Sequence, residues 1–585
     1  MITGIAAEEE KVSNKNTPKV GRTGYPSIDK PWLKYYSKEA INKPLPYDTA
    51  YGYMASENTN NLNMPALNYF GRKITYGEMF ENIEKATDAF VSLGIKSGDI
   101  VTGISVTTPE VVYIVYALNR IGAISNWLDP RTDTIQIINE LLDTNTKLFI
   151  VLSNFQNQFL NLDELSNMRV LRLTVAESLP ILPKIFMGIK EESKPSGWLS
   201  YKEFISKGLH TNILKFQDDM SYMPAIMEHT GGTTGNPKAV VLTNQNMNTI
   251  VQQYRLGGTQ LSTGDAWLSV AFPFTAYALI CSLHIPLSCG MCCGLCFTMD
   301  LKKIENMLLN GKYNHMANTP VMWEQLLKSR KVRNADLSFL INPIVGADTL
   351  NIDKEKEINE FLIAHHCNSK IKKGYGMTEV SSAACVTPTN DCNKVGSVGI
   401  PFVNTTISIF DMDTGREMKY NEQGEICITG PTLMKEYFHN KKETEAVIRI
   451  HSDGQRWIHS GDLGHMDPDG FVFIDGRIKR MLIDHHGFKI FAPKVEEVIS
   501  TCRCVDKCCV VGVKDKDYSV GQKAIAYIIM KAGLKNGLDE IKNVCKDKLQ
   551  SYAIPADYLI VDEFPYTSAA KVDYLALQKR YEQER

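Results

Sequence analysis

His229-Thr-Gly-Gly-Thr-Thr-Gly-Asn-Pro-Lys238 is the most informative stretch of this sequence, and it lies between two strand-like runs, Tyr222 to Met227 and Ala239 to Leu242. Its three glycines lack a Cβ and permit positive φ, so successive backbone N–H groups can converge on phosphate oxygens. The threonine hydroxyls add donors, and Lys238 adds a positive charge. A Gly/Thr-rich turn on its own is more often a plain hairpin, so companion motifs must decide whether this one binds phosphate.

The stretch differs from a Walker-type P-loop. That motif places Gly directly before the lysine and Ser or Thr directly after it, and a helix begins there. Here Pro237 precedes Lys238, Ala239 follows it, and the next residues are strand-like. A kinase or a P-loop NTPase is therefore disfavoured.

Length and charge narrow the class of protein. A chain of 585 residues exceeds what one hydrophobic core organises, which predicts several domains. Lys plus Arg (64) nearly balances Asp plus Glu (66), so no overall basic field exists and no nucleic-acid partner is expected. Met1 to Lys19 contains no apolar run long enough for a secretory signal, so we expect a cytoplasmic location.

Between Asp265 and Asp300 the chain carries no formally charged residue, which raises the question of a membrane span. Pro273, Pro286 and several glycines interrupt this segment. A buried strand-helix-strand unit explains it better, so no stable membrane insertion is expected.

Two groups of cysteines contain metal-like spacings. They are Cys289, Cys292, Cys293 and Cys296, and Cys502, Cys504, Cys508 and Cys509. Such spacings also occur in zinc and iron-sulfur sites, so both alternatives must be considered. Because the first group lies in an apolar segment and the second leads into a strand-like run, we interpret them as reduced core residues.

Strand-like and helix-like stretches alternate along most of the chain, which indicates an α/β fold. The predicted strands include Ile100 to Val106, Lys147 to Leu152, Met168 to Leu173 and Ala266 to Val270. The predicted helices include Thr75 to Leu93 and Pro109 to Ile121.

From about Asp467 the pattern of strand-like and helix-like stretches changes. The turn Asp467-Pro-Asp-Gly470 predicts a hairpin, and Gly476-Arg-Ile-Lys-Arg480 reads as a linker. Pro493 is placed to start a helix. Beyond it we expect strands at Cys508 to Val513 and Ala524 to Met530 and a helix from Leu538 to Leu549, enough for a small second domain.

Companion motifs follow the loop in a fixed order, and together they identify a resemblance. Thr230 to Lys238 resembles the signature loop of the superfamily that contains acyl-CoA synthetases, adenylation domains and luciferases. The companions are Gly346-Ala-Asp348, Gly374-Tyr-Gly-Met-Thr-Glu379, Gly396 to Pro401, Gly424 to Gly430, Ser460-Gly-Asp462, Gly476 to Arg480, Gly487-Phe-Lys-Ile490 and Pro565 to Lys571. The match runs from about Ile74 to the C-terminus, and chance does not produce so many ordered motifs.

The resemblance implies a domain division and a fold. It implies an N-terminal AMP-binding (adenylation) domain over residues 1–476, a hinge at 477–480, and a C-terminal lid domain over 481–585. The expected fold class is a large α/β adenylating domain with a small mobile α+β domain.

The resemblance also implies the roles of single residues. Lys238, Thr378, Glu379 and Lys571 would be catalytic, Glu379 would position Mg²⁺, and Arg480 would be the hinge. Lys571 would bridge the substrate carboxylate and the α-phosphate. The residues that would contact ATP are Thr230, Gly231, Gly232, Thr233, Thr234, Gly235, Gly346, Ala347, Asp348, Gly374, Tyr375, Gly376, Met377, Asp462 and Arg477. Gly487, Phe488 and Lys489 would lie beside the pantetheine of coenzyme A.

Four positions depart from the family pattern. Ala239, Glu436 and Ala570 replace glycines, and Arg480 stands where the hinge is usually Asp or Lys. Replacing Gly by Ala in two loops restricts positive φ and is able to shift their geometry.

The segment Phe272-Pro-Phe-Thr-Ala-Tyr277 bears on the substrate. Amino-acid-activating relatives carry an Asp there that pairs with the substrate ammonium, and this segment has no carboxylate. An apolar or aromatic acid fits better, and Phe272, Phe274 and Tyr277 are candidates to line its pocket, although such aromatic residues are more often core.

The expected function is an ATP-dependent ligase that joins a fatty or aryl carboxylic acid to coenzyme A through an acyl-AMP. ATP, Mg²⁺ and coenzyme A are the expected cofactors, and a small carboxylic acid is the expected partner. Two alternatives stay open: a stand-alone adenylation enzyme that loads a carrier protein, and a catalytically degenerate nucleotide-binding homologue.

Overall fold

The computed structural model of the chain describes residues 22–160, 162–180, 184, 193–209, 220–230, 238–270, 272–514, 520–531, 533–534, 537–566 and 572–584. Six predicted site residues lie outside this range. They are Gly231, Gly232, Thr233, Thr234, Gly235 and Lys571. Ala570, one of the departures from the family pattern, lies outside it as well.

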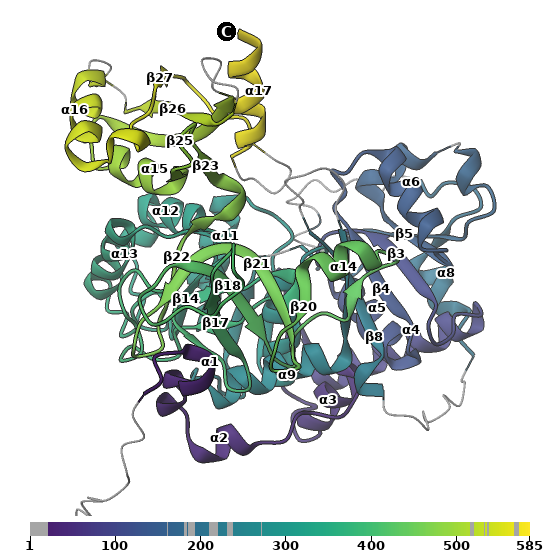
Figure 1. Cartoon of the computed structure of the whole chain (residues 1–585). Helices are drawn as coiled ribbons and strands as arrows, with labels where there is room; N and C mark the ends of the chain where they lie inside the picture. The colour runs from purple at the N-terminus through teal and green to yellow at the C-terminus, as the bar shows by residue number, and fades with distance from the viewer. Residues whose placement is uncertain are drawn as a thin grey trace, which may run out of the picture.

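Two large mixed sheets form the body of the N-terminal part (Figure 1). The nine-stranded sheet runs, in spatial order, β16 (Ile400–Pro401), β15 (Cys385–Val386), β14 (Lys372–Tyr375), β13 (Asn342–Val345), β12 (His315–Asn318), β10 (Ala266–Ser269), β11 (Cys292–Leu295), β1 (Pro65–Tyr69) and β2 (Arg72–Thr75). The eight-stranded sheet runs β19 (Glu436–Tyr437), β9 (Lys238–Thr243), β8 (Pro224–Thr230), β4 (Ile124–Leu128), β3 (Ile100–Ile104), β5 (Leu148–Leu152), β6 (Val170–Leu173) and β7 (Leu199–Ser200).

Helices connect and cover these strands. Those of the N-terminal part are α1 (Pro26–Asp29), α2 (Lys38–Asn42), α3 (Ala50–Glu57), α4 (Tyr76–Ser92), α5 (Pro109–Ile121), α6 (Thr134–Asp143), α8 (Tyr201–Ser206), α9 (Asn244–Leu256), α10 (Ile285–Ser288), α11 (Leu301–Gly311), α12 (Pro320–Lys328), α13 (Ile352–Ala364) and α14 (Lys441–Val447). The predicted helices at 75–93 and 109–121 are confirmed as α4 and α5. Local chemistry explains their ends: Thr75 and Glu78 form a capping box, and Pro109 opens α5 behind the cap residue Thr108.

The uncharged segment forms the predicted strand-helix-strand unit. β10 and β11 pair in parallel, and between them lie a π-helix, η5 (Tyr277–His284), and α10. Pro286 has no N–H to donate, so a regular helical ladder cannot run through this point. The structure therefore confirms the unit but gives its helix an irregular first half.

A five-stranded antiparallel sheet follows, made of β17 (Thr406–Phe410), β18 (Gly424–Thr429), β20 (Ile448–Ile450), β21 (Arg456–Met466) and β22 (Val472–Arg477). The predicted hairpin at Asp467 to Gly470 joins β21 to β22 and is confirmed. Asp467 Oδ1 accepts the backbone N–H groups of Asp469 and Phe471, both at 2.9 Å, which fixes the turn.

The remaining residues form a small lobe with its own apolar cores. It contains β23 (Met481–Ile483), β24 (Lys489–Phe491), α15 (Ala492–Ser500), β25 (Val505–Lys514), β26 (Gln522–Met530), α16 (Leu538–Lys548), β27 (Asp557–Ile560) and α17 (Tyr574–Glu584). Figure 1 shows this lobe in yellow and green, standing above the rest of the molecule. A large α/β part with a smaller C-terminal part confirms the predicted fold class.

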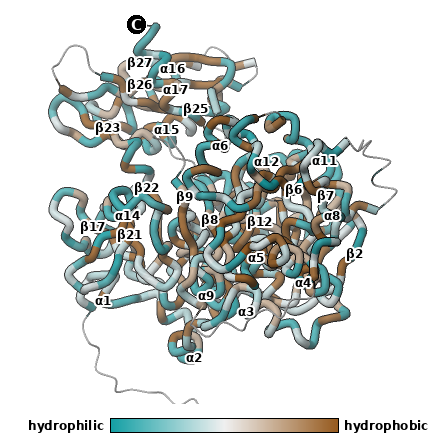
Figure 2. The backbone as a smooth tube through the Cα atoms, turned by 90° about the vertical axis from the view of Figure 1, so that its right-hand side faces the viewer, coloured by the Kyte–Doolittle hydropathy of each residue, from teal (hydrophilic) through white to brown (hydrophobic). Residues whose placement is uncertain are grey.

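The cysteines interpreted as core residues lie in apolar surroundings. Cys289, Cys293, Cys296, Cys502, Cys504 and Cys509 are buried, and Cys292 and Cys508 are half-buried. Figure 2 shows the hydrophobic stretches gathered in the interior, around strands such as β8 and β12. Their burial agrees with the interpretation of these cysteines as core residues.

Residues 22–69, for which the sequence predicted little, dock onto the N-terminal body. Trp32 is fully buried, and Gly470 approaches its backbone so closely that a Cβ at position 470 would lie 2.7 Å from the Trp32 backbone nitrogen. The Tyr36 hydroxyl donates to the Pro401 carbonyl at 2.8 Å. This segment thus completes the core of the N-terminal part.

None of the helices in the described ranges is both long and apolar enough to cross a membrane.

Candidate functional site

Several predicted site residues lie at the carboxyl ends of parallel strands in the nine-stranded sheet. Gly346 follows β13, and Gly374 and Tyr375 end β14, the strand paired with it. The Gly346 N–H donates to the carbonyl of Asn318, the last residue of β12, at 3.1 Å. In open α/β sheets ligands bind at this edge, so the strand order itself favours a site here.

Tyr375, Asp462 and Arg477 form one hydrogen-bonded group. The Tyr375 hydroxyl donates to Asp462 Oδ2 at 2.7 Å, and Arg477 Nε lies 2.8 Å from Asp462 Oδ1. Asp462 and Arg477 face each other across the β21–β22 ladder. Burial, and then the Asp462 charge, raise the pKa of Tyr375, so its hydroxyl stays protonated and acts as the donor.

The backbone around Asp462 is shaped by a second carboxylate, that of Glu425 on β18. Its Oε1 accepts the Gly461 N–H at 3.0 Å, and its Oε2 lies 2.7 Å from His459 Nδ1. Burial favours a higher pKa for Glu425, but the contacts with His459 and Gly461 outweigh it and lower the pKa. The charged Glu425 therefore fixes the bend that presents Asp462. The sequence placed Glu425 in a structural motif but gave it no role.

Glu379 and Lys238 meet through Tyr437, a residue that the sequence did not single out. The Tyr437 hydroxyl donates to Glu379 Oε1 at 2.7 Å, and Lys238 Nζ lies 4.9 Å from the centroid of the Tyr437 ring. Lys238 also forms an ion pair with Glu443 near the start of α14. Tyr437 and Glu443 could not be identified as partners of Lys238 from the sequence, because both lie about two hundred residues after it.

The loop between Tyr375 and Glu379 makes a close turn. A Cβ at Gly376 would lie 2.2 Å from the Ser382 carbonyl oxygen, so only glycine fits there. Ser381 and Ser382 have φ of 60° and 92°, conformations that side chains rarely adopt. Backbone strain of this kind concentrates at ligand sites.

The aromatic residues predicted to line the acid pocket are half-buried. Phe272 and Phe274 stack with ring centroids 5.5 Å apart, and the Arg131 guanidinium lies 5.8 Å from the Phe274 centroid. Tyr277 opens the π-helix, and one turn later Cys281 Sγ lies 2.8 Å from Ser382 Oγ. The segment thus contacts the loop that carries Glu379. Its role as a pocket wall stays a prediction.

The predicted coenzyme A residues lie on the small lobe, apart from the Tyr375 group. Gly487 has φ of 85°, Phe488 stacks on Tyr552 at 4.7 Å, and Lys489 Nζ lies 3.0 Å from Asp413 Oδ2 of the N-terminal part. Among the described residues, neither Phe488 nor Lys489 has a hydrogen bond, ion pair or ring contact with Tyr375, Asp462 or Arg477.

Arg480, the predicted hinge, is anchored within the small lobe. Its guanidinium pairs with both oxygens of Glu496, donates to the Val510 carbonyl at 3.0 Å, and lies 5.4 Å from the Tyr574 ring centroid. The Arg480 side chain therefore moves with the small lobe. If the lobe rotates at this position, the rotation must occur about the backbone bonds of Arg480.

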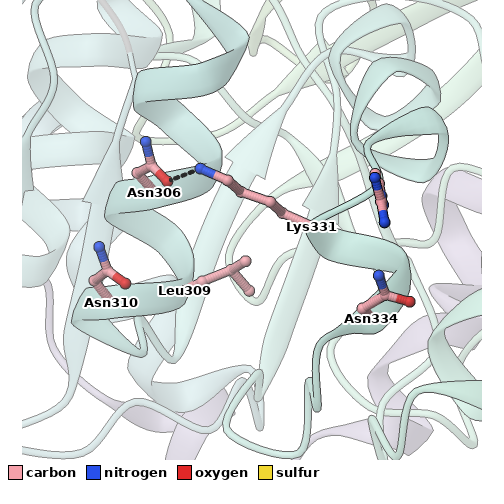
Figure 3. A pocket seen from close by; sticks show the side chains of 6 residues that line it. Asn306, Leu309, Asn310, Lys331 and Asn334 are labelled. Carbon is pink, nitrogen blue, oxygen red and sulfur yellow. Dashed lines mark hydrogen bonds between the residues drawn. The ribbon is translucent and has the colours of Figure 1, made fainter.

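A surface pocket of about 470 Å³ lies away from these groups, between α11 and the residues after α12 (Figure 3). Asn306, Leu309, Asn310, Arg330, Lys331 and Asn334 line it. Lys331 Nζ donates to Asn306 Oδ1 at 2.7 Å, and no predicted site residue faces this pocket.

Two family models match the chain. Residues 55–438 match the model described as AMP-binding enzyme, and residues 494–571 match the AMP-binding enzyme C-terminal domain. The first match alone covers more than half of the 585 residues.

Curated relatives align with nearly the whole chain. A long-chain-fatty-acid–CoA ligase from Bacillus subtilis is 26% identical over 553 residues, which cover 93% of this chain and 96% of that protein. 4-Coumarate–CoA ligase 3 from Arabidopsis thaliana is 25% identical over 583 residues, which cover 97% of this chain and 95% of that protein. The predicted enzyme class, an AMP-forming acid–thiol ligase, agrees with these relatives.

The fold is also that of solved structures. ATP-bound MatB from Rhodopseudomonas palustris superposes with a TM-score of 0.79 at 20% identity, over 92% of this chain and all of the other. The motifs, the fold and the match over residues 55–438 lead to one conclusion: the chain belongs to the AMP-binding enzyme family of adenylate-forming enzymes.

Proposed function

We propose that this protein is an ATP-dependent ligase that activates an apolar carboxylic acid, fatty or aryl, as its acyl-AMP and then transfers the acyl group to coenzyme A. The observation that carries the proposal is the convergence of Tyr375, Asp462 and Arg477 at the carboxyl edge of the parallel strands, beside the loop of Glu379. Relatives named as ligases for long-chain fatty acids and for 4-coumarate support an acid of either kind.

In this proposal the Tyr375 group holds the nucleoside of ATP. The Asp462 carboxylate accepts hydrogen bonds from the ribose hydroxyls, because it is an ionised acceptor held in place between the Tyr375 hydroxyl and the Arg477 guanidinium. The Tyr375 ring packs against adenine, and Arg477 holds the carboxylate in place and adds positive charge near the phosphates.

Glu379 and Lys238 act on the phosphates. Glu379 suits Mg²⁺ because it offers a hard oxygen ligand: Tyr437 occupies Oε1, and among the described residues no hydrogen bond to Oε2 exists. When bound, Mg²⁺ would neutralise charge on the phosphate oxygens. Lys238 supplies a second positive charge from the start of β9, and Lys571 is expected to bridge the attacking carboxylate and the α-phosphate.

Ala239 does not weaken the proposal. It lies inside β9 opposite His229, in extended backbone that alanine adopts without strain. The replacement of glycine at this position therefore needs no change in the strand, which favours an active enzyme over a degenerate one. A cytoplasmic location, where ATP and coenzyme A are abundant, belongs to the same proposal.

The test is a screen for pyrophosphate release with ATP and Mg²⁺, with and without coenzyme A. The panel should contain long-chain fatty acids, hydroxycinnamic and other aryl acids, and free amino acids. We expect release with at least one apolar acid, an acyl-CoA product when coenzyme A is present, and poor activity with amino acids because Phe272 to Tyr277 lacks a carboxylate. A panel with no release would contradict the proposed activity, and efficient aminoacyl-AMP formation would contradict the proposed acid class.

A further inference from the structure

Tyr437 lies between the two charged groups that the proposed function assigns to the phosphates of ATP. Its hydroxyl donates to Glu379 Oε1 at 2.7 Å, and its ring face lies 4.9 Å from Lys238 Nζ. Tyr437 is 3% exposed and Glu379 is also buried, so the hydrogen bond between them is made away from bulk water, whereas the Lys238 side chain is 26% exposed. A buried hydrogen bond to a carboxylate is directional and comparatively strong.

The backbone around Tyr437 is fixed from three sides. β19 pairs with β9, with Tyr437 opposite Val240, so the ring stands next to the strand that begins with Lys238. The Met434 N–H donates to the Glu379 carbonyl at 2.8 Å, and the Tyr437 N–H donates to Thr444 Oγ1 at 3.0 Å. The segment 434–438 is therefore a rigid bridge between the loop of Glu379 and the strand of Lys238.

We propose that Tyr437 is a positioning residue that orients the Glu379 carboxylate toward Mg²⁺ and holds Lys238 beside it. The inference rests on the proposed function, because it assigns Mg²⁺ and ATP to these two groups. A hydrogen bond to Oε1 fixes the rotation of the carboxylate and directs Oε2 toward the cation. The ring face attracts the Lys238 ammonium independently of the hydroxyl.

These two contacts can be separated by substitution. Tyr437→Phe keeps the ring over Lys238 and removes only the donor to Glu379. Tyr437→Leu removes both. Tyr36→Phe is the matched control, because Tyr36 is also buried and its hydroxyl also makes one hydrogen bond, to the Pro401 carbonyl, in a part of the protein that carries no predicted site residue.

The measurement is ATP binding by calorimetry across a series of Mg²⁺ concentrations, which needs no knowledge of the acid. For Tyr437→Phe we expect the Mg²⁺ concentration for half-maximal binding to rise about tenfold, the usual effect of removing a partner of a metal ligand. ATP binding without Mg²⁺ should stay within about twofold for Tyr437→Phe, since the Lys238 contact remains, and should weaken about fivefold for Tyr437→Leu.

The possible outcomes distinguish a failure of the positioning role from a failure of the proposed function. An unchanged Mg²⁺ dependence in Tyr437→Phe, with wild-type protein that binds MgATP, would overturn the positioning role alone. An equal shift in Tyr36→Phe would show that the loss of any buried hydroxyl has this effect, which also overturns the role. Wild-type protein that binds no ATP at any Mg²⁺ concentration would instead refute the proposed function. Unfolding temperatures of the three variants, measured in parallel, confirm that each is folded.

Discussion

The Tyr375 hydroxyl and Asp462 Oδ2 are 2.7 Å apart, although 87 residues separate them in sequence. The contact joins the end of β14 in the nine-stranded sheet to β21 in the five-stranded sheet. The nucleoside site proposed here is therefore built across two sheets, and both must fold before it exists.

Replacing Asp462 by Asn should weaken ATP binding about tenfold to a hundredfold, because a charged acceptor for the ribose hydroxyls becomes neutral. Asp467→Asn is the matched control: Asp467 is also buried on the connection after β21 and pairs with Lys394. Calorimetric titration with ATP checks both variants. A similar loss of affinity in the control would mean that the effect comes from the sheet and not from the ribose.

Glu443→Gln should strengthen ATP binding by about twofold to fivefold. In the wild type, Lys238 must leave its ion pair with Glu443 to bind a phosphate, and the variant has no such ion pair to break. The Lys238 ammonium beside it lowers the pKa of Glu443, so the carboxylate is charged at neutral pH. Glu445→Gln, which removes another carboxylate of α14 that pairs with Lys441, should leave the affinity unchanged. Weaker binding in Glu443→Gln would show that Glu443 holds Lys238 in a productive position.

Lys571→Ala should lower the rate of acyl-AMP formation by about a hundredfold or more, because the transition state loses a group that stabilises its charge. Thioester formation from supplied acyl-AMP and coenzyme A should stay largely intact. Lys579→Ala, an exposed lysine of α17, serves as the control. We expect the small lobe to present Lys571 for adenylation and Gly487 to Lys489 for thioester formation in two different orientations. Equal losses in the two half-reactions would contradict this expectation.

Arg480→Pro should have the opposite pattern and slow the thioester half-reaction more than adenylation, because a fixed φ obstructs rotation at the hinge. The substitution also removes the ion pair with Glu496, so Arg480→Ala must be measured beside it. We expect Arg480→Ala to lower the unfolding temperature of the small lobe but to retain both half-reactions. If Ala and Pro impair the thioester step equally, the anchor and not the backbone rotation is the cause.

Acid should destabilise the protein through His284. Burial, and then the charge of Arg255, lower the pKa of His284 to about 3, while its ring contacts Tyr116 and Asn248. An unfolded histidine titrates near 6.5, so below about pH 6.5 the unfolded state binds the extra proton and stability falls by about 1.4 kcal/mol per pH unit for this group. Between pH 7 and pH 5, thermal unfolding of His284→Asn should therefore depend less on pH than that of the wild type. The exposed His366→Asn should follow the wild type, and a parallel dependence in His284→Asn would contradict the assignment.

Local patterns were sufficient to predict several of the regular elements. The capping box at Thr75 and Glu78 and the proline that opens α5 are short-range signals, and both helices begin where these signals place them. The π-helical start of the unit after β10 had no such signal, because it depends on how Tyr277 to His284 packs against neighbouring elements.

The site was predictable only in part for the same reason. Motifs named Tyr375, Asp462 and Arg477, and the structure brings them together. Glu425, Tyr437 and Glu496 received no role from the sequence, because each acts through a partner that lies between 16 and 58 residues away along the chain. A single sequence shows which residue types are present, but it does not show which buried carboxylate meets which donor.

The ion pair between Lys489 and Asp413 has a consequence for how the enzyme would respond to its surroundings. Both side chains are substantially exposed, at 39% and 74%, so water and dissolved ions screen their attraction. Pairs of this kind contribute between about 0 and 1 kcal/mol, comparable to thermal energy. The ion pair therefore holds the small lobe against the body only weakly. Added salt should weaken this attraction further, so that the lobe leaves this orientation more often.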